Sequence, residues 1–286
     1  MQRELLRLER RLLRAASQAI SDHGLIENGD RILVAVSGGK DSYTLLHLLM
    51  RLKQRAPIHF DLVAANLDQG QPGFPADVLR RHFEGVGVPH VMLAADTYSV
   101  VKRLVPEGKT TCPVCSRLRR GILYNAAVEL RCNKIALGHH RDDLIETLLL
   151  SALYSGRLQS MPAKLRSDDG RNVVIRPLCY APEDEIGRFA ELMKFPIVPC
   201  DLCGSQPNLR RRKVKELLAG LAAEHPSVKG NLLNALQTVV PSHLLDRRLS
   251  ARLAGAGGTD PWIDEEEEGC GGPSPEAQPL LTLERR

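Results

Sequence analysis

The fold is decided by the stretch Arg31-Ile-Leu-Val-Ala-Val-Ser-Gly-Gly-Lys-Asp-Ser42, which leads directly into five leucines at helical spacing. Its first half is an apolar, partly β-branched run typical of a buried parallel strand, and the leucines indicate a helix. Two adjacent glycines let the backbone approach an anion closely, while the new helix points unpaired N–H groups at the same place. With the charge of Lys40 added, the turn is predicted to bind phosphate.

This turn differs from two common phosphate-binding motifs. A Walker A sequence needs a glycine five residues before Gly39 and a Ser or Thr after the lysine, where this chain has Val34 and Asp41. A dinucleotide fingerprint needs a third glycine, which does not follow at the required spacing. Because an aspartate in a phosphate cradle would repel its ligand, Asp41 predicts a Mg²⁺ ion that bridges its carboxylate and a pyrophosphate.

The composition is that of a globular protein with a basic body. The chain has 286 residues, of which 43% are hydrophobic, and its net charge of +5 includes four consecutive glutamates at 265–268 near the C-terminus. A basic body suggests a polyanionic partner. There is no run of eighteen apolar residues and no uninterrupted apolar segment near the N-terminus, so we expect neither a membrane span nor a secretory signal, and a cytoplasmic location.

Two further segments follow predicted strands and carry acidic or imidazole groups. Asp68 comes after the strand predicted at 59–66 and is a candidate for the nucleotide or the metal, although a turn aspartate explains it equally well. The sequence Gly138-His-His-Arg-Asp-Asp143 follows a strand predicted at 134–138. Asp143 and Glu146 have capping-box spacing, which predicts a well-capped helix. The cluster also suits acid–base chemistry or Mg²⁺ binding, and the two roles are compatible.

Seven cysteines include two Cys-x-x-Cys pairs, Cys112/Cys115 and Cys200/Cys203. In a chain without an export signal, such pairs point to metal or sulfur chemistry rather than to disulfides. The first pair precedes a helix predicted at 116–131, whose dipole favours thiolates. A structural zinc site and an iron–sulfur cluster both remain open, and composition alone favours zinc.

Two helices carry many cations. In residues 1–23, leucines form one stripe of a predicted helix and arginines cover most of the remaining surface. The helix could pack on its own domain with its arginines in solvent, or it could contact a second copy of the chain or RNA. The basic run, defined as Arg210, Arg211, Arg212 and Lys213, begins another helix and is predicted to contact a phosphate backbone. A last helix with a break at Pro241 is expected over 226–246, and the glycine-, proline- and glutamate-rich end is predicted to be disordered.

In combination, four segments resemble the tRNA 2-thiocytidine synthetase family of PP-loop ATP pyrophosphatases. They are Ser37-Gly-Gly-Lys-Asp-Ser42, the pair Cys112/Cys115, Gly138-His-His-Arg-Asp-Asp143 and Pro199-Cys-Asp-Leu-Cys-Gly-Ser-Gln-Pro-Asn208, in this order. The resemblance implies an α/β fold of the HUP type (adenine nucleotide alpha hydrolase-like), with a parallel sheet, helices on both faces and small helical extensions at both ends. We accordingly expect four parts, namely an N-terminal amphipathic helix (1–25), a PP-loop ATP-binding domain (26–200), a helical segment (201–248) and a tail (249–286). The resemblance covers roughly residues 5–245 and says nothing about the tail.

The resemblance also implies a reaction, its cofactors and its site. The enzyme would use Mg-ATP to adenylate C2 of cytidine at tRNA position 32, and would then thiolate it with sulfur from a cysteine desulfurase-type donor and a [4Fe-4S] cluster. Cys112, Cys115 and Cys203 would hold the cluster, leaving Cys200 as a spare thiol. The residues that would bind ATP are Ser37, Gly38, Gly39, Lys40, Asp41, Ser42, Asp68, Gly138 and His140. Those expected to act in catalysis are Lys40, Asp41, Asp142 and Asp143, with His139 or His140 moving protons.

Two other functions are open at this point. One is a different tRNA-adenylating enzyme of the same fold, such as a uridine thiolase or a lysidine synthetase. Uridine thiolases commonly carry an N-terminal zinc-finger pair, whereas residues 1–30 contain no cysteine. The other is a non-catalytic zinc protein that binds RNA, which the intact Lys40, Asp41 and Ser42 disfavour.

Overall fold

The computed structural model describes residues 1–105, 112–167, 169–198 and 209–255. Its centre is a six-stranded sheet in the order β3-β2-β1-β4-β6-β5. The strands are β1 (Arg31–Ala35), β2 (Asp61–Asp68), β3 (His90–Ala94), β4 (Lys134–Ala136), β5 (Lys164–Arg166) and β6 (Val173–Ile175). All neighbouring strands are parallel except β5, which runs antiparallel to β6 at one edge. The expected α/β class is confirmed, and the antiparallel edge strand is an addition to it.

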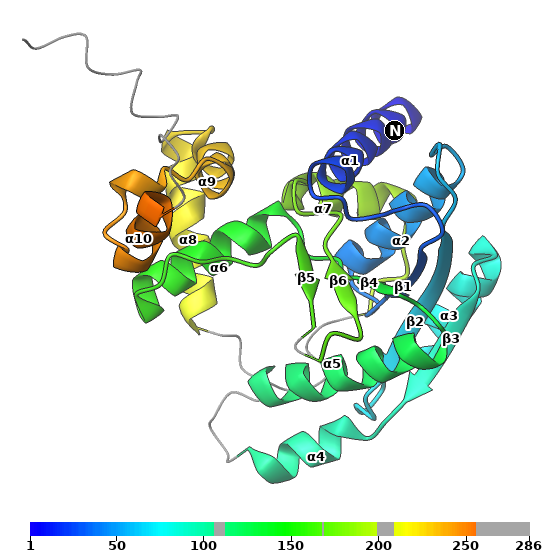
Figure 1. Ribbon diagram of the computed structural model, residues 1–286. Coiled ribbons are helices and arrows are strands. Elements are labelled where there is room, and N and C mark those ends of the chain that lie inside the picture. The colour runs from blue at the N-terminus through cyan, green and yellow to red at the C-terminus, as the bar shows by residue number, and fades with distance from the viewer. Residues whose placement is uncertain (106–111, 168, 199–208, 256–286) are drawn as a thin grey trace, which may run out of the picture. The chain divides into compact units, whose positions relative to one another are not determined.

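Helices cover both faces of the sheet, as Figure 1 shows. On one side α2 (Lys40–Lys53) packs on β1 and β2 and contacts α1 (Gln2–Asp22) and α7 (Glu183–Met193). On the other side α5 (Cys112–Glu129) packs on β2 and β4 and contacts α4 (Thr97–Leu104). The helix α3 (Ala76–Val86) contacts β2 and β3. Because both faces are covered, β1 is a continuous apolar run in which Ile32, Leu33 and Val34 are fully buried.

The core between the sheet and α5 shows why these segments fold together. Leu33 of β1 and Ile135 of β4 pack with Ala127 of α5, and all three side chains are almost fully buried. Small residues such as Ala127 let the helix lie close to the sheet, where the side chains interdigitate.

A smaller core fixes the charged helix α8 (Leu209–Glu224) beside α6 (Arg141–Ser155). Ile145 of α6 packs against Val214 and Leu218 of α8, and leucines of α6 and α9 (Val228–Gln237) surround them. The basic run therefore belongs to a helix that is packed against α6 and α9.

The chain divides into two compact units, Met1–Asn234 and Ala235–Arg286. In the second unit a 3₁₀ turn (Pro241–His243) precedes α10 (Arg247–Gly255). The helix expected over 226–246 with a break at Pro241 is shorter than predicted, because α9 ends at Gln237, before Pro241. Helix α10 crosses the predicted start of the tail at 249, and residues 256–286 lie outside the described ranges. None of the helices in the described ranges is long and apolar enough to cross a membrane.

Candidate active site

The order of the strands places a crevice between β1 and β4. From β1 the chain continues to β2 and β3 on one side of the sheet, whereas β4 leads to β6 on the other. In open α/β sheets, ligands bind at such a switch point, outside the carboxyl ends of the two strands. The loop 36–39 follows β1 and the loop 137–140 follows β4, and β1 and β4 are paired directly. The structure therefore brings two of the predicted segments together.

The two loops approach each other so closely that glycine is needed. A Cβ atom added to Gly138 would lie 3.1 Å from the carbonyl carbon of Asp41 and 3.1 Å from the backbone nitrogen of Ser42. Gly38 has a φ of +90°, and a Cβ there would lie 2.8 Å from Cγ2 of Val198. The backbone N–H of Val198 donates to the carbonyl of Gly38 at 2.9 Å. Side chains at either glycine would displace the loop.

The loop opens a helix whose first turn is available to an anion. Gly39 is the N-cap of α2, and no side chain of the described part of the chain caps the helix. Ser42 is buried, and its hydroxyl donates to the carbonyl of Gly39 at 2.9 Å and lies 3.4 Å from the hydroxyl of Ser37, an exposed residue. The first N–H groups of a helix have no intrahelical acceptor, so this arrangement fits a phosphate group.

Lys40 is held between two carboxylates at this helix start. Its Nζ lies 2.8 Å from Oδ1 of Asp41 and 3.3 Å from Oε1 of Glu183. Burial alone would lower the pKa of Lys40, but the hydrogen bond and charge of Asp41, with those of Glu183, outweigh burial and raise it. The ammonium group is thus charged at neutral pH and directed by acids from two different helices.

His140 lies buried among three carboxylates. Its Nε2 is 3.5 Å from Oδ2 of Asp143, 3.7 Å from Oδ1 of Asp41 and 4.0 Å from Oε1 of Glu183. Its Nδ1 accepts the backbone N–H of Asp143, whose carboxylate accepts the backbone N–H of His140. These two bonds form the capping box of α6. The predicted box of Asp143 and Glu146 is wrong, because the helix begins one turn earlier than that spacing requires.

Asp142 ties three helices together. Its carboxylate lies 2.7 Å from Nζ of Lys229 on α9 and accepts the backbone N–H of Glu183 at the start of α7. Burial would raise the pKa of Asp142, but the bonds to Lys229 and to the Glu183 backbone outweigh it and lower the pKa. The aspartate is therefore ionised and already occupied by cationic and N–H partners.

His139 meets a buried arginine. Its Nδ1 accepts a hydrogen bond from Nε of Arg176 at 3.1 Å. Burial, with the charge of Arg176, lowers the pKa of His139 to about 4. The imidazole is neutral at physiological pH, and one of its nitrogens is engaged.

Three important side chains were missed by sequence reasoning: Glu146, Glu183 and Lys215. Lys215 of α8 lies 3.4 Å from Glu146 and 3.2 Å from Glu183. Glu146 is only 2% exposed, and burial raises its pKa although Lys215 and Arg211 act in the opposite direction. The available signal was the glutamate itself, which interrupts an otherwise apolar helix face between Ile145 and Leu148. Nothing local in the sequence links Glu183 or Lys215 to the loop.

The remaining predicted residues are placed less completely. Asp68 lies at the end of β2, where its carboxylate accepts the backbone N–H of Gly70 as a turn aspartate does. The thiol of Cys115 lies 3.0 Å from Oε1 of Gln69, and so at the carboxyl end of β2. Cys112 is the first residue of α5, whereas Cys200 and Cys203 lie outside the described ranges. The set of cluster ligands stays a prediction.

The three arginines of the basic run contact neighbouring side chains. Arg211 lies 3.6 Å from Glu146 and 3.9 Å from Asp143, and Arg212 lies 3.7 Å from Glu216 of its own helix. The guanidinium of Arg210 stacks over the ring of Tyr154. The contact of the basic run with a phosphate backbone stays a prediction.

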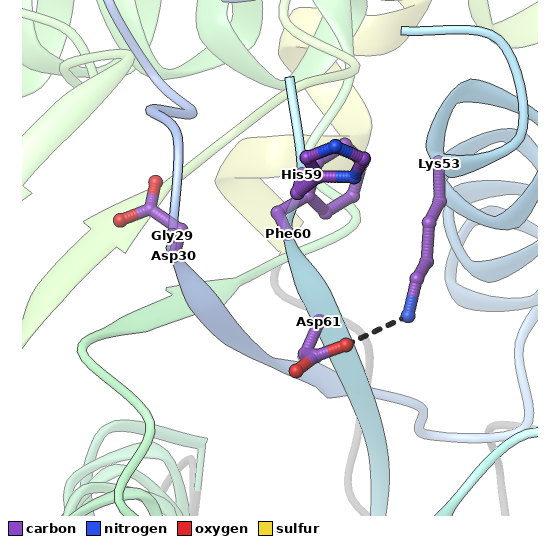
Figure 2. Close-up of a pocket in the computed structure, with 6 residues that line it drawn as sticks. All are labelled: Gly29, Asp30, Lys53, His59, Phe60 and Asp61. Atoms are coloured by element: carbon purple, nitrogen blue, oxygen red, sulfur yellow. Dashed lines mark hydrogen bonds and ion pairs between the residues drawn. The ribbon is translucent and has the colours of Figure 1, made fainter. Parts of the chain in front are cut away.

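Two further observations delimit the site. Within the described ranges, no three His, Cys, Asp or Glu side chains are grouped so that they could hold a metal ion. A pocket of about 180 Å³ lies at the opposite, amino ends of β1 and β2, next to the ion pair of Lys53 and Asp61 (Figure 2). It is lined by Gly29, Asp30, Lys53, His59, Phe60 and Asp61. This pocket is separate from the loop at the carboxyl edge.

Comparison with known proteins identifies the family. The PP-loop domain family matches residues 6–221. The tRNA-cytidine(32) 2-sulfurtransferase of Anaeromyxobacter sp. (strain K) is 74% identical over 274 residues, which cover 95% of this chain and 94% of the relative. The enzyme of the same name from Burkholderia mallei (strain SAVP1) is 56% identical over 269 residues, covering 93% of this chain and 81% of the relative.

A solved structure shares the fold. The U34-tRNA thiolase NcsA from Methanococcus maripaludis, with its [4Fe-4S] cluster, superposes with a TM-score of 0.67 and 22% identity over 83% of this chain and 80% of the thiolase. The motifs, the strand order and the two high-identity relatives agree. The chain therefore belongs to the tRNA-cytidine(32) 2-sulfurtransferase family of PP-loop proteins.

Proposed function

We propose that this protein is an ATP-dependent sulfurtransferase that adenylates and then thiolates C2 of cytidine at tRNA position 32. The observation that carries the proposal is the meeting of the Ser37–Ser42 loop with the Gly138–Asp143 segment at the switch point, where Lys40 lies between Asp41 and Glu183. The 74% identity to a tRNA-cytidine(32) 2-sulfurtransferase supports the substrate. Uridine thiolation and lysidine synthesis are thereby disfavoured.

The loop supplies what cleavage of ATP requires. The carbonyl oxygen at C2 of cytidine is a poor leaving group, and attachment of AMP to it makes it a good one. The uncapped N–H groups of α2 and the charged Lys40 would bind the phosphates and stabilise the pyrophosphate as it departs. Asp41 and Glu183 fix the position of Lys40, so the cation need not reorganise during the reaction.

Mg²⁺ is the metal that fits this donor set. It is usually held in such sites by one or two carboxylates, with water and substrate phosphates as its other ligands. Asp41 and Asp143 converge on His140 and would hold the ion, and Asp142 could join them only by releasing Lys229. Bound there, Mg²⁺ would neutralise charge that develops on the phosphates.

The cysteine triad is proposed to lie beside this edge. Among the thiols of the triad, that of Cys115 is described by the structure. It lies in the first turn of α5, next to Gln69 after β2, where the helix dipole favours a thiolate. With Cys112 and Cys203 it would hold a [4Fe-4S] cluster, whose iron without a protein ligand would supply the position from which sulfur is delivered. We further propose a cysteine desulfurase-type sulfur donor, a cytoplasmic location and a homodimer.

Loss of Asp41 tests the adenylation site. We expect Asp41→Ala to abolish tRNA-dependent pyrophosphate release and thiolation while the fold is retained, because the carboxylate is one-third exposed and makes no core contact. Asp77→Ala, an exposed aspartate of α3, is the matched control. Retained pyrophosphate release and thiolation in the Asp41 variant would overturn its role.

Cys200 and Cys203 separate the two metal hypotheses. If three cysteines hold a [4Fe-4S] cluster, Cys200→Ala keeps its iron and sulfide, whereas Cys203→Ala loses both together with activity. If four cysteines close a zinc site, both variants are damaged similarly. Iron, sulfide and zinc are measured after anaerobic purification, and equal loss of metal in the two variants would refute the triad.

A further inference from the structure

Helix α1 carries four arginines on its outward side. Arg3, Arg7, Arg10 and Arg14, the arginine stripe, are spaced by four, three and four residues and therefore lie on one side of the helix. All four are exposed. The buried residues of α1 occupy the opposite side, which packs against α2 and α7; they are Leu8, Leu12, Leu13, Ala16 and Ala19.

The acids of α1 do not compensate this stripe. Glu4 bonds Arg188 of α7 at 2.8 Å, and Glu9 is bonded by His47 and Arg51 of α2. The fifth arginine, Arg11, forms an ion pair with Glu185. For the arginine stripe, in contrast, the described part of the chain provides no ion pair and no side-chain hydrogen bond. Like charges one helical turn apart destabilise a helix by about 0.2–0.5 kcal/mol per pair, a cost that an anionic partner would remove.

The packing of α1 narrows the kind of partner. A helix that lies in a membrane surface must offer its apolar side to lipid, but that side of α1 is buried against two other helices. A two-fold contact with a second copy of the chain through this surface would bring two arginine stripes together. A row of uncompensated guanidinium groups matches a phosphodiester backbone instead.

The stripe also points toward the active site. Glu4 pairs with Arg188 and Arg11 pairs with Glu185, so α1 and α7 run antiparallel. Helix α7 begins at Glu183, which contacts Lys40 of the PP loop. The Arg14 end of the stripe therefore lies nearer to the start of α7 and the PP loop, and the Arg3 end lies farther from them.

We propose that the arginine stripe binds the phosphate backbone of tRNA and directs the substrate toward the PP-loop edge. The proposal rests on the proposed function for the identity of the RNA, and it assigns a substrate-binding surface to α1 in addition to the basic run. Because the stripe contacts phosphates rather than bases, it contributes affinity and orientation without sequence preference.

The test replaces the whole stripe and matches its charge change elsewhere. The variant R3Q/R7Q/R10Q/R14Q is compared with R55Q/R80Q/R81Q/R131Q, whose four arginines are also exposed and form no ion pair within the described ranges. Binding of unmodified tRNA is measured by fluorescence anisotropy across salt concentrations. The salt slope is the slope of the logarithm of the binding constant against the logarithm of the salt concentration. We expect its magnitude to be smaller by about 3 in the stripe variant, because each lost phosphate contact reduces it by about 0.7–0.9. The KM for tRNA should rise about tenfold or more at physiological salt, while ATP binding is unchanged.

Each outcome decides between the possibilities. A stripe variant with the salt slope of the control overturns the proposal, and so does one that changes sedimentation from dimer to monomer while it binds tRNA normally. Wild-type protein that neither binds nor thiolates tRNA overturns the proposed function itself, which keeps the two failures distinct. Circular dichroism and thermal unfolding verify that both variants are folded.

Discussion

The close approach of Gly138 to the PP loop can be tested by adding one methyl group. In Gly138→Ala the new Cβ would lie 3.1 Å from two backbone atoms of Asp41 and Ser42, and 3.2 Å from the Asp41 carbonyl oxygen. Ordinary contacts of a Cβ are 3.4–4 Å. The neighbours are backbone rather than flexible side chains, so the loop must move by a few tenths of an ångström.

The substitution changes the free energy of unfolding in two opposite ways. Overpacking at a tight backbone contact lowers it by about 1–3 kcal/mol, whereas the reduced conformational freedom of the unfolded chain raises it by about 0.4–1 kcal/mol. A net loss of about 1–2 kcal/mol lowers the Tm by roughly 2–8 °C in a domain of this size. Since a displacement of about 1 Å can cost about 100-fold in rate, one of a few tenths of an ångström should slow pyrophosphate release roughly 4- to 10-fold.

The assay combines thermal unfolding with tRNA-dependent release of pyrophosphate. Gly85→Ala is the control, because nothing lies within 4 Å of its added Cβ and alanine should stabilise α3 by about 0.5–1 kcal/mol. If Gly138→Ala unfolds and turns over like the wild type, the reasoning that this contact positions the loop is refuted.

Three further variants probe the charges of the site. Glu183→Gln frees one partner of Lys40, so the KM for ATP should rise; an unchanged KM in steady-state assays would show that Asp41 alone positions the lysine. The fold favours neutral His139, whose pKa is lowered from 6.5 to about 4, so its contribution to stability is complete above about pH 6.5 and is lost as pH falls toward 4. In denaturant titrations, the free energy of unfolding of His139→Gln should depend less on pH between about 4 and 6.5 than that of the wild type. The same pH dependence in both proteins would contradict this. Replacing the four residues of the basic run by glutamine should reduce the magnitude of the salt slope of tRNA binding by about 0.7–0.9 per lost phosphate contact. An unaltered slope would show that these residues do not contact the phosphate backbone.

The parts of the fold with strong local signals were predictable. The strand, turn and helix around Ser37–Ser42 are encoded in adjacent residues, and the helix after Pro182 follows from its acidic first turn. The edge strand β5 was missed because all three of its residues are exposed and only pairing with β6 makes it a strand. Helix α4 was also missed, although Asp96 caps it by accepting the N–H of Ser99.

The site was predictable only where its residues belong to recognisable motifs. Asp41 and His140 lie in two such segments, and the switch point brings them together. Glu183 and Lys215 have no local signature, because their roles arise from helices that meet after folding. The capping box was assigned one turn late for a related reason, since histidine as an N-cap is not distinguished by spacing alone.

The most direct test of the central claim is to map the product on tRNA. Anaerobically purified protein is incubated with ATP, Mg²⁺, a sulfide source and unmodified tRNA that carries cytidine at position 32, and the digested RNA is analysed by mass spectrometry. We predict 2-thiocytidine at position 32 only, dependent on ATP and absent in the Asp41→Ala protein. Thiolation of a uridine, or no thiolated nucleoside from iron-loaded protein, would contradict the account.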